Sequence, residues 1–333
     1  MTTLTPARLK EIITAALVAS RTSPDVASIV ADALTLAEID GKKGHGLSRV
    51  PSYAGQARSG KVDGMATPVM ARPKPAVLAI DAKHGFAYPA FELMQQHLPP
   101  LVREQGVGLA LISHSHHYGV AGHHVERLAD AGLVALLFGN TPAAMAPPGG
   151  KTPLFGTNPV AFAAPVGGQP PVVIDLATSK VARGNILAAR QRGEPIPEGW
   201  ALDADGNPTT DADAALAGSM VPMADAKGAA LALMIEVLAA ALTGSAFADE
   251  ASSFFEAEGT PPNTGQVMLA INPGLVTGDM AERLAGFAAR IEADGGRLPG
   301  SSRVVRRGMA VSGLAVDKSA LAAACDIAGI PLE

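Results

Sequence analysis

The stretch that most constrains the fold runs from Gly106 to Asn140, where a strand, a polar turn, a helix and a second strand follow one another. The apolar, β-branched run Val107–Ile112 predicts a buried strand, and Leu133–Phe138 predicts another. A helical segment that ends at Ala131 lies between them. This alternation predicts an α/β fold, in which ligands bind where the strands end.

Three histidines crowd the turn after the first of these strands: His114, His116 and His117. Two of them, His114 and His116, would point the same way on a strand, an arrangement that suits a metal site. The sequence nearby offers no carboxylate or cysteine at ligand spacing, and H-E-x-x-H and C-x-x-C motifs are absent. We therefore expect no metal. His123 and His124 fall within the helix, where packing or surface roles are expected.

Composition excludes several classes of protein. The net charge of −5 gives no basic surface for nucleic acid. The single cysteine, Cys325, excludes disulfides within the chain, favours a reducing compartment and is expected to be a buried structural thiol. The N-terminus lacks the apolar core of a secretory signal, and the most apolar window carries Glu236 and is shorter than the ~20 residues that a bilayer needs. A cytoplasmic protein without a membrane partner is expected.

Length and patterning predict two regions. We expect a helical region over residues 1–72, packed with the C-terminal segment 305–333, and an α/β domain over residues 73–304. Thr5–Pro6 and Ser23–Pro24 are helix start signals. Further strands are predicted at Val77–Ile80, Val160–Val166, Val172–Leu176 and Gln266–Ile271, and helices at Pro89–Arg103, Ala226–Leu242 (buried), Asp279–Ala293 and Ser319–Ile327, with another that ends at Gly193.

Glycine placement gives no nucleotide fingerprint. The chain has no G-x-G-x-x-G after a predicted strand and no G-x-x-x-x-G-K-[ST], so neither a Rossmann dinucleotide site nor a P-loop is indicated. The glycine-rich stretches GVAG and PGGKTPLFGTNP either approach a ligand with bare backbone or are flexible surface loops.

His45 and Arg49 are four residues apart in GHGLSRV, so a helix would place both side chains on one face. An imidazole exchanges protons near neutral pH, and a guanidinium binds a carboxylate through two parallel hydrogen bonds. This pair suits an enzyme that acts on an acid whose carbonyl becomes an alcohol. The alternative is a surface turn with an incidental histidine.

Polar residues also follow the strand that ends on Asp175. Arg183 is a candidate second carboxylate clamp, while Thr178 and Ser179 are either ligand contacts or caps of the next helix. Lys227, beside Asp225 at the start of the apolar helix, is either a ligand-facing cation or half of a weak ion pair.

Together and in this order, five blocks resemble the type-2 malate/L-lactate dehydrogenase family: GHGLSRVPSY, SHHYGVAGHH, PLFGTNPVAFAAP, VIDLATSKVARGNI and DAKGAALALMIEVLAAALTG. The resemblance covers about residues 5–300. It implies a non-Rossmann fold with a mixed sheet and flanking helices. It also implies a homodimer that uses NAD or NADP without a metal and acts on small carboxylic acids, either 2-hydroxy/2-oxo acids or cyclic imino acids.

The resemblance also implies residue roles. His45 matches the proton donor, Arg49 matches a carboxylate-binding arginine, and one branch treats the His117 position as a catalytic base. Substrate contacts match Thr157, Arg183 and Gly184. Cofactor contacts match His117, Tyr118, Gly119, Val120, Ala121, Asp175, Leu176, Ala177, Lys227, Gly300, Ser301 and Ser302.

Two departures from the family pattern bear on the chemistry. Many members have a serine just before the proton-donating histidine, paired with an aspartate two residues after the Arg183 position. Here those positions hold Gly44 and Asn185, which cannot pass a proton as that pair does, so this relay is not expected. The turn PGSS also replaces the more usual PGER.

The sequence therefore predicts an NAD(P)-dependent dehydrogenase of a small 2-hydroxy/2-oxo acid resembling malate or lactate. The alternative within the family is a reductase of a cyclic imino acid such as Δ1-piperideine-2-carboxylate or Δ1-pyrroline-2-carboxylate. Outside it, the histidine cluster leaves a metal hydrolase or a non-enzymatic ligand-binding protein as rival interpretations.

Overall fold

The protein is built on a mixed sheet of seven strands. The computed structural model describes residues 1–275, 278–310 and 313–332. In spatial order the strands are β2 (Val69–Lys74), β3 (Val77–Asp81), β4 (Val107–Ser115), β11 (Thr264–Ile271), β5 (Val134–Gly139), β6 (Val160–Val166) and β7 (Gln169–Leu176). Strands β3 and β4 are parallel and the other neighbours pair antiparallel. The predicted α/β fold is confirmed, and its sheet differs from the parallel Rossmann sheet.

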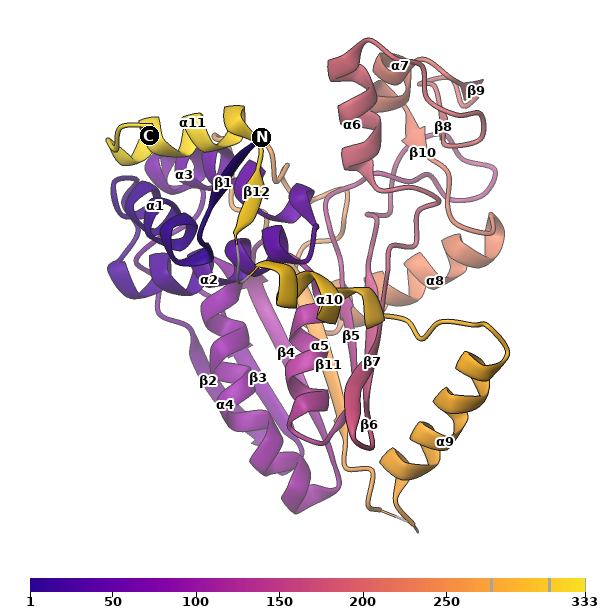
Figure 1. Ribbon diagram of the computed structural model, residues 1–333. Helices are drawn as coiled ribbons and strands as arrows, with labels where there is room; N and C mark the ends of the chain where they lie inside the picture. Colours follow the sequence, from indigo (N-terminus) through magenta and orange to yellow (C-terminus); the bar gives the residue numbers. More distant parts are fainter. Residues whose placement is uncertain (276–277, 311–312, 333) are drawn as a thin grey trace.

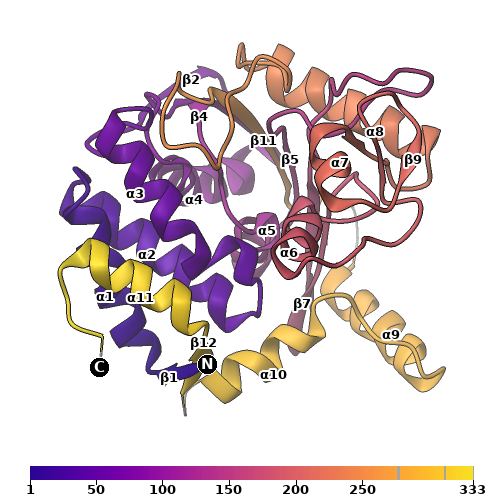
Figure 2. The same ribbon diagram turned by 90° about the horizontal axis from the view of Figure 1, so that it is seen from above.

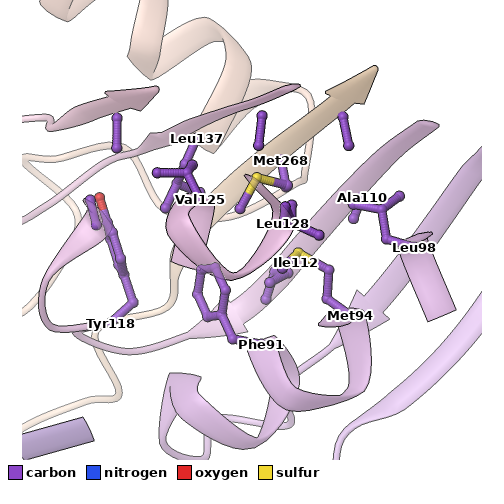
Figure 3. Packing of buried hydrophobic residues seen from close by; sticks show 14 of the residues in the cluster. Phe91, Met94, Leu98, Ala110, Ile112, Tyr118, Val125, Leu128, Leu137 and Met268 are labelled. Carbon is purple, nitrogen blue, oxygen red and sulfur yellow. The ribbon is translucent and has the colours of Figure 1, made fainter. Parts of the chain in front are cut away.

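Helices cover the two faces of this sheet. Helices α4 (Ala87–Gln105) and α5 (Ala121–Asp130) pack on one face, and Figure 3 shows their apolar side chains meeting those of the strands. On β6, Ala161 and Ala163 belong to this core, whereas the alternate residue Ala164 packs with α9 (Met280–Ala293) on the opposite face.

A helical lobe lies at one side of the upper sheet edge in Figure 1. It contains α1 (Pro6–Val18), α2 (Pro24–Ile39) and α3 (Val50–Ser59), and the side chains of Thr5 and Ser23 cap the first two helices, as predicted. Helix α11 (Lys318–Ala328) packs against α1 and α3, and β12 (Leu314–Val316) pairs with β1 (Thr2–Leu4), which brings the chain ends together (Figure 2). Of the segment 305–333, residues 311, 312 and 333 lie outside the described residues.

The Cys325 side chain is 2% exposed in the apolar core of this lobe, so its predicted burial is confirmed.

A second lobe lies on the other side of the same edge (Figure 1). It contains α6 (Arg183–Arg192), α7 (Ala212–Ala217) and a small sheet of β8 (Ala201–Leu202), β9 (Pro208–Thr209) and β10 (Ser219–Met220) around its own apolar cluster. The helix predicted to end at Gly193 is confirmed as α6. The rest of this lobe comes from a stretch with turn signals and little periodicity, which explains why its other elements were not predicted.

The helix predicted at Ala226–Leu242 is present, but the prediction that it is buried is wrong. Helix α8 (Ala226–Glu236) continues into a π-helical turn, η3 (Val237–Ala241), and Leu233 and Val237 are 52% and 53% exposed. A segment that is apolar all round carries no signal for which face meets the core. Strand β2 and helix α10 (Ser301–Ala310) were also not predicted.

No helix within the described ranges combines the length and the hydropathy that crossing a membrane requires.

The strand directions bring the candidate site segments to one edge of the sheet. Strands β4, β5 and β7 end there, and β11 and β6 begin there, because each neighbouring pair from β4 to β7 is antiparallel. The two lobes flank this edge (Figure 1). The turn after β4, the segment before β6 and the residues after β7 therefore share one region of the molecule.

Candidate functional site

His45 and Arg49 lie on two short 3-10 turns, η1 (Lys43–His45) and η2 (Leu47–Arg49), rather than on the single helix that their spacing favoured. The Glu38 carboxylate accepts a hydrogen bond from Leu47 N at 2.8 Å and fixes the second turn on α2. A Cβ at Gly46 would collide with that carboxylate, so the break between the turns requires glycine. Arg49 Nε donates to the Gly44 carbonyl at 2.7 Å.

His45 begins a chain of hydrogen bonds that leads into the interior. His45 Nδ1 lies 3.2 Å from His117 Nε2, with the rings 8° from parallel. His117 Nδ1 lies 2.5 Å from the Tyr53 hydroxyl, which lies 3.1 Å from the Tyr88 hydroxyl. The chain joins the η1 turn, the segment after β4, helix α3 and helix α4. Its last three members are buried, whereas His45 is partly exposed.

The surroundings of this chain keep its members uncharged. Burial, together with the charge of Arg49, lowers the pKa of His45 to about 3. The same two causes hold the pKa of His117 well below its ordinary value. Burial raises the pKa of Tyr53 to about 12, against the opposing effect of Arg49. At neutral pH both imidazoles and the phenol are therefore neutral.

Arg49 has unused hydrogen-bonding capacity. Its guanidinium carbon lies 4.5 Å from the centroid of the Phe255 ring, so one face of the group is covered. The Nη1 atom of Arg49 is buried and finds no hydrogen-bond partner within the described residues. Burial also lowers the pKa of the guanidinium. A buried, unsatisfied cationic donor is costly, which makes this atom a place for an anionic ligand.

A second network holds the segment between β5 and β6. Thr141 Oγ1 accepts from Thr157 N at 2.9 Å, and Asn158 Oδ1 accepts from Thr141 N at 3.2 Å. The buried Glu236 carboxylate accepts from Asn158 Nδ2 at 2.7 Å and from Asn140 Nδ2 at 3.3 Å, and the backbone amides of Gly156 and Ala248 also donate to it. Thr157 is thus placed by a carboxylate on the apolar helix α8.

We expect Glu236→Gln to destabilise the protein by about 1–3 kcal/mol, because one side of the amide turns a donor towards groups that already donate. Urea denaturation measures the effect, with the exposed Glu198→Gln as the matched control. Equal midpoints for the two variants would show that this network does not support the fold.

Three candidate cofactor segments meet beside the end of β7. The Asp175 carboxylate accepts from Gly122 N, at the start of α5, at 2.9 Å. The turn before α10 lies against β7, since Val173 N donates to the Pro299 carbonyl at 3.2 Å. Gly300 has φ +91°, and a Cβ there would lie 3.2 Å from the Val173 carbonyl.

This region fits a dinucleotide. Helices α5 and α10 both begin here, and helix N-termini favour phosphate. Ser301 and Ser302 are exposed at the start of α10. The buried Arg303 Nε finds no hydrogen-bond acceptor in the described part of the chain, although its guanidinium pairs with Glu126 at 3.4 Å. Hydroxyl, amide and guanidinium donors are thus available to a phosphate.

The residues after β4 point in different directions. His114 has φ +48°, which breaks the strand alternation, so the expectation that it points with His116 is wrong. His114 Nδ1 contacts Asp81 at 3.0 Å, whereas His116 Nε2 contacts the Gln56 amide oxygen at 3.0 Å. Across the described residues, no group of three or more His, Cys, Asp or Glu side chains could hold a metal ion.

The Tyr118 side chain points into the core, where its ring lies 5.8 Å from that of Phe91 (Figure 3). The Tyr118 side chain is 2% exposed, so it offers no surface to a ligand. His123 and His124 are both buried: the first contacts Asp40 and the second contacts the Tyr118 carbonyl.

The remaining candidates lie towards the second lobe. Arg183, at the start of α6, is partly buried, and its Nη1 lies 3.4 Å from the Ala143 carbonyl. Gly184, Leu176 and Lys227 are exposed and Ala177 is partly exposed.

The hydrogen bonds and ion pairs of the described residues exclude a helix-capping role for Thr178 and Ser179 and an ion pair for Lys227. Thr178 and Ser179 are not helix caps, because the Thr178 hydroxyl donates to the Thr157 carbonyl and the Ser179 hydroxyl to the Val181 carbonyl. No ion pair joins Lys227 to Asp225 within the described ranges.

The sequence pattern of the family described as malate/L-lactate dehydrogenase matches residues 4–321. The chain belongs to this family. It is therefore a nicotinamide-dependent oxidoreductase. It is 54% identical over 280 residues, 83% of each chain, to "(2R)-3-sulfolactate dehydrogenase (NADP(+))" of Chromohalobacter salexigens. It is 38% identical over 307 residues, 90% of this chain and 89% of the other, to a Δ1-pyrroline-2-carboxylate/Δ1-piperideine-2-carboxylate reductase of Pseudomonas putida.

Solved structures of the malate/L-lactate dehydrogenase family share this fold. The Δ1-piperideine-2-carboxylate reductase of Pseudomonas syringae superposes with a TM-score of 0.93 at 36% identity, covering 98% of this chain and all of that one. The sulfolactate dehydrogenase of Methanocaldococcus jannaschii superposes with a TM-score of 0.86 at 28% identity, covering 99% and 98%.

Sequence reasoning missed several residues of this site. Tyr53 follows Arg49 by four positions, so helical spacing was a usable signal for it. The pair Phe254–Phe255 stands out in a polar segment of a chain with 4% aromatic residues. Tyr88 had no local signal, since only the packing of α4 against α3 and the turn after β4 brings it to Tyr53.

Proposed function

We propose that this enzyme transfers a hydride between NADP(H) and a small 2-hydroxy/2-oxo acid that carries a second acidic group, as 3-sulfolactate does. The observation that carries the proposal is the buried Nη1 of Arg49, which has no hydrogen-bond partner among the described residues and lies on the same short segment as His45, whose ring contacts His117. The relative at 54% identity, named for sulfolactate and NADP, supports this choice of substrate and cofactor.

A dianionic substrate suits the cations of the site. Arg49 and Arg183 are both partly buried, and neither forms an ion pair with the residues that the structure describes. In our proposal Arg49 binds the carboxylate through a bidentate pair. Arg183 and Gly184, with Thr157, then contact the second acidic group from the other lobe.

His45 handles the proton. During oxidation the substrate hydroxyl gives its proton to His45 Nε2, the nitrogen not engaged with His117, and during reduction His45 returns it. A bound nicotinamide would take up the hydride that leaves C2 of the acid in oxidation, or supply it to that carbon in reduction. The chain His45–His117–Tyr53–Tyr88 can run in either direction, so it presents Nε2 as an acceptor or as a donor.

Substrate binding and protonation are coupled in this scheme. After burial, the charge of Arg49 is the largest cause of the low pKa of His45. A carboxylate bound to Arg49 offsets that charge, so it raises the pKa of His45 and favours proton transfer to the ring. This hydrogen-bonded chain takes the place of the relay that Gly44 and Asn185 lack.

The cofactor in this proposal lies along the backbone of His117–Ala121 and of Asp175–Ala177. Gly300–Ser302, at the start of α10, and Lys227 also contact the cofactor in this proposal. The N-termini of α5 and α10 supply amide donors to the cofactor phosphates.

A substrate panel tests the function. We expect the highest kcat/KM for 3-sulfolactate with NADP, lower values for malate and lactate, and no effect of EDTA. Preferred NADPH-dependent reduction of Δ1-piperideine-2-carboxylate or Δ1-pyrroline-2-carboxylate would establish the alternative, an imine reductase, which the P. putida and P. syringae relatives make the second candidate. Binding without turnover, or loss of activity with EDTA, would contradict both.

We further propose a cytoplasmic homodimer, in which residues 1–72 with 305–333 and residues 73–304 act as two units. The support for a dimer is the uncharged stripe of Leu233, Met234, Val237 and Leu242, each more than 40% exposed. Light scattering of the purified protein should give twice the chain mass, and Val237→Glu should give the monomer mass. Met65→Glu, at an exposed position elsewhere, should leave the dimer intact.

A further inference from the structure

We propose that residues 253–258, here called the aromatic segment, form a wall of the substrate pocket that positions Arg49, and that Lys61 holds this wall in place. The inference rests on the proposed function, because it assigns Arg49 to the substrate carboxylate. It adds Phe255 as a specificity-determining residue and Lys61 as a positioning residue.

Lys61 anchors the backbone of the aromatic segment. Its side chain is buried, 2% exposed, although it carries an ammonium group. Nζ donates to the carbonyls of Ser253 at 2.8 Å, Glu256 at 3.1 Å and Glu258 at 3.1 Å, so all three of its protons have acceptors. Three backbone carbonyls from one short loop thus converge on a single cation.

Helix α3 adds two more hydrogen bonds to the same segment. Gln56 Nε2 donates to the Glu256 carbonyl at 2.9 Å, and the Ser59 hydroxyl donates to the Ala257 carbonyl at 2.6 Å. Gln56 also binds His116 through its amide oxygen. The anchor is therefore continuous with the segment after β4, which carries His117.

The anchored segment presents two aromatic rings to the site. The Phe254 ring is 5% exposed and lies 5.3 Å from the rings of both His116 and His117. The Phe255 ring is 47% exposed and covers one face of the Arg49 guanidinium at 4.5 Å. One ring thus supports the proton-handling histidines, and the next supports the guanidinium whose Nη1 has no partner in the described chain.

Placing an ammonium in this position is costly, because burial lowers the pKa of Lys61. Removing it would leave three carbonyls without a donor. Helix α3 begins directly after Arg49 and ends two residues before Lys61, so this helix connects the residue that bears the guanidinium to the residue that anchors its ring partner. This arrangement fixes Phe255 relative to Arg49. The exposed edge of the ring then limits the bulk that a bound acid can carry beside its carboxylate.

Steady-state kinetics with the best acid of the panel test the role of Phe255. We expect Phe255→Ala to raise KM about tenfold, from the loss of a cation–π contact and of the wall, with kcat changed less and the Kd of NADPH unchanged. Phe255→Tyr, which keeps the ring, should restore KM. An unchanged KM in Phe255→Ala, or a failure of Phe255→Tyr to restore it, would overturn the assignment.

Limited chymotrypsin digestion tests the role of Lys61 without relying on turnover. In Lys61→Met we expect cleavage after Phe254 or Phe255, identified by mass spectrometry, to be at least tenfold faster than in wild type. Lys10→Met, which removes a surface lysine paired with Asp32, should cleave at the wild-type rate. Equal cleavage of all three proteins would overturn the anchor. An enzyme inactive on every acid would refute the proposed function, while the digestion would still decide the anchor.

Discussion

Replacing His45 by alanine is expected to lower kcat by about 10²- to 10⁴-fold on the preferred acid, the usual contribution of a positioned general acid or base. The Kd of NADPH should stay within a factor of about three, since no candidate cofactor contact is removed. Stopped-flow absorbance of the reduced cofactor gives the rate, and fluorescence titration gives the affinity. Wild-type turnover in this variant would remove His45 from the chemistry.

Tyr53→Phe is the matched companion of that variant. It keeps the buried ring but removes the hydroxyl that contacts both His117 and Tyr88. Because the substitution leaves His45 in place, we expect a smaller fall in kcat, about 10-fold, and a changed pH profile of kcat. A fall equal to that of His45→Ala would indicate that His117, rather than His45, exchanges the proton with substrate.

Replacing Arg49 by lysine should lower kcat/KM by about 10- to 100-fold, mainly by raising KM. The substitution keeps the positive charge but loses the planar fork that forms two parallel hydrogen bonds. It also loses the flat face that stacks on Phe255. Initial rates over a range of acid concentrations measure the effect. An unchanged KM would place the substrate carboxylate elsewhere.

The sequence was sufficient to predict six of the seven strands of the main sheet and several of the helices. Val160–Val166 was predicted with the bounds that the structure shows, and the signals at Thr5–Pro6 and Ser23–Pro24 mark the positions where α1 and α2 begin. These succeeded because periodicity and capping are local properties of the chain. Strand β2 was missed because Pro73 interrupts it, which an edge strand with a bulge tolerates.

The site was only partly predictable for the same reason. His45 and Arg49 were predicted as site residues from their spacing and from the family blocks. The structure leaves the Nη1 atom of Arg49 without a partner in the described residues. The contacts of His45 with His117 and of Lys61 with Ser253 join residues 72 and 192 positions apart. No local pattern reports such contacts. They depend on how the lobe of α1–α3 sits on the sheet edge.

The most direct test of the central claim separates acid binding from proton transfer. Calorimetry with oxamate, an unreactive carboxylate analogue of a 2-oxo acid, added to the NADPH complex would give Kd for wild type, His45→Ala and Arg49→Lys. The account predicts binding within a few-fold of wild type in His45→Ala, despite its lost turnover, and binding about 10-fold or more weaker in Arg49→Lys. Equal binding by wild type and Arg49→Lys, or no binding by wild type, would contradict it.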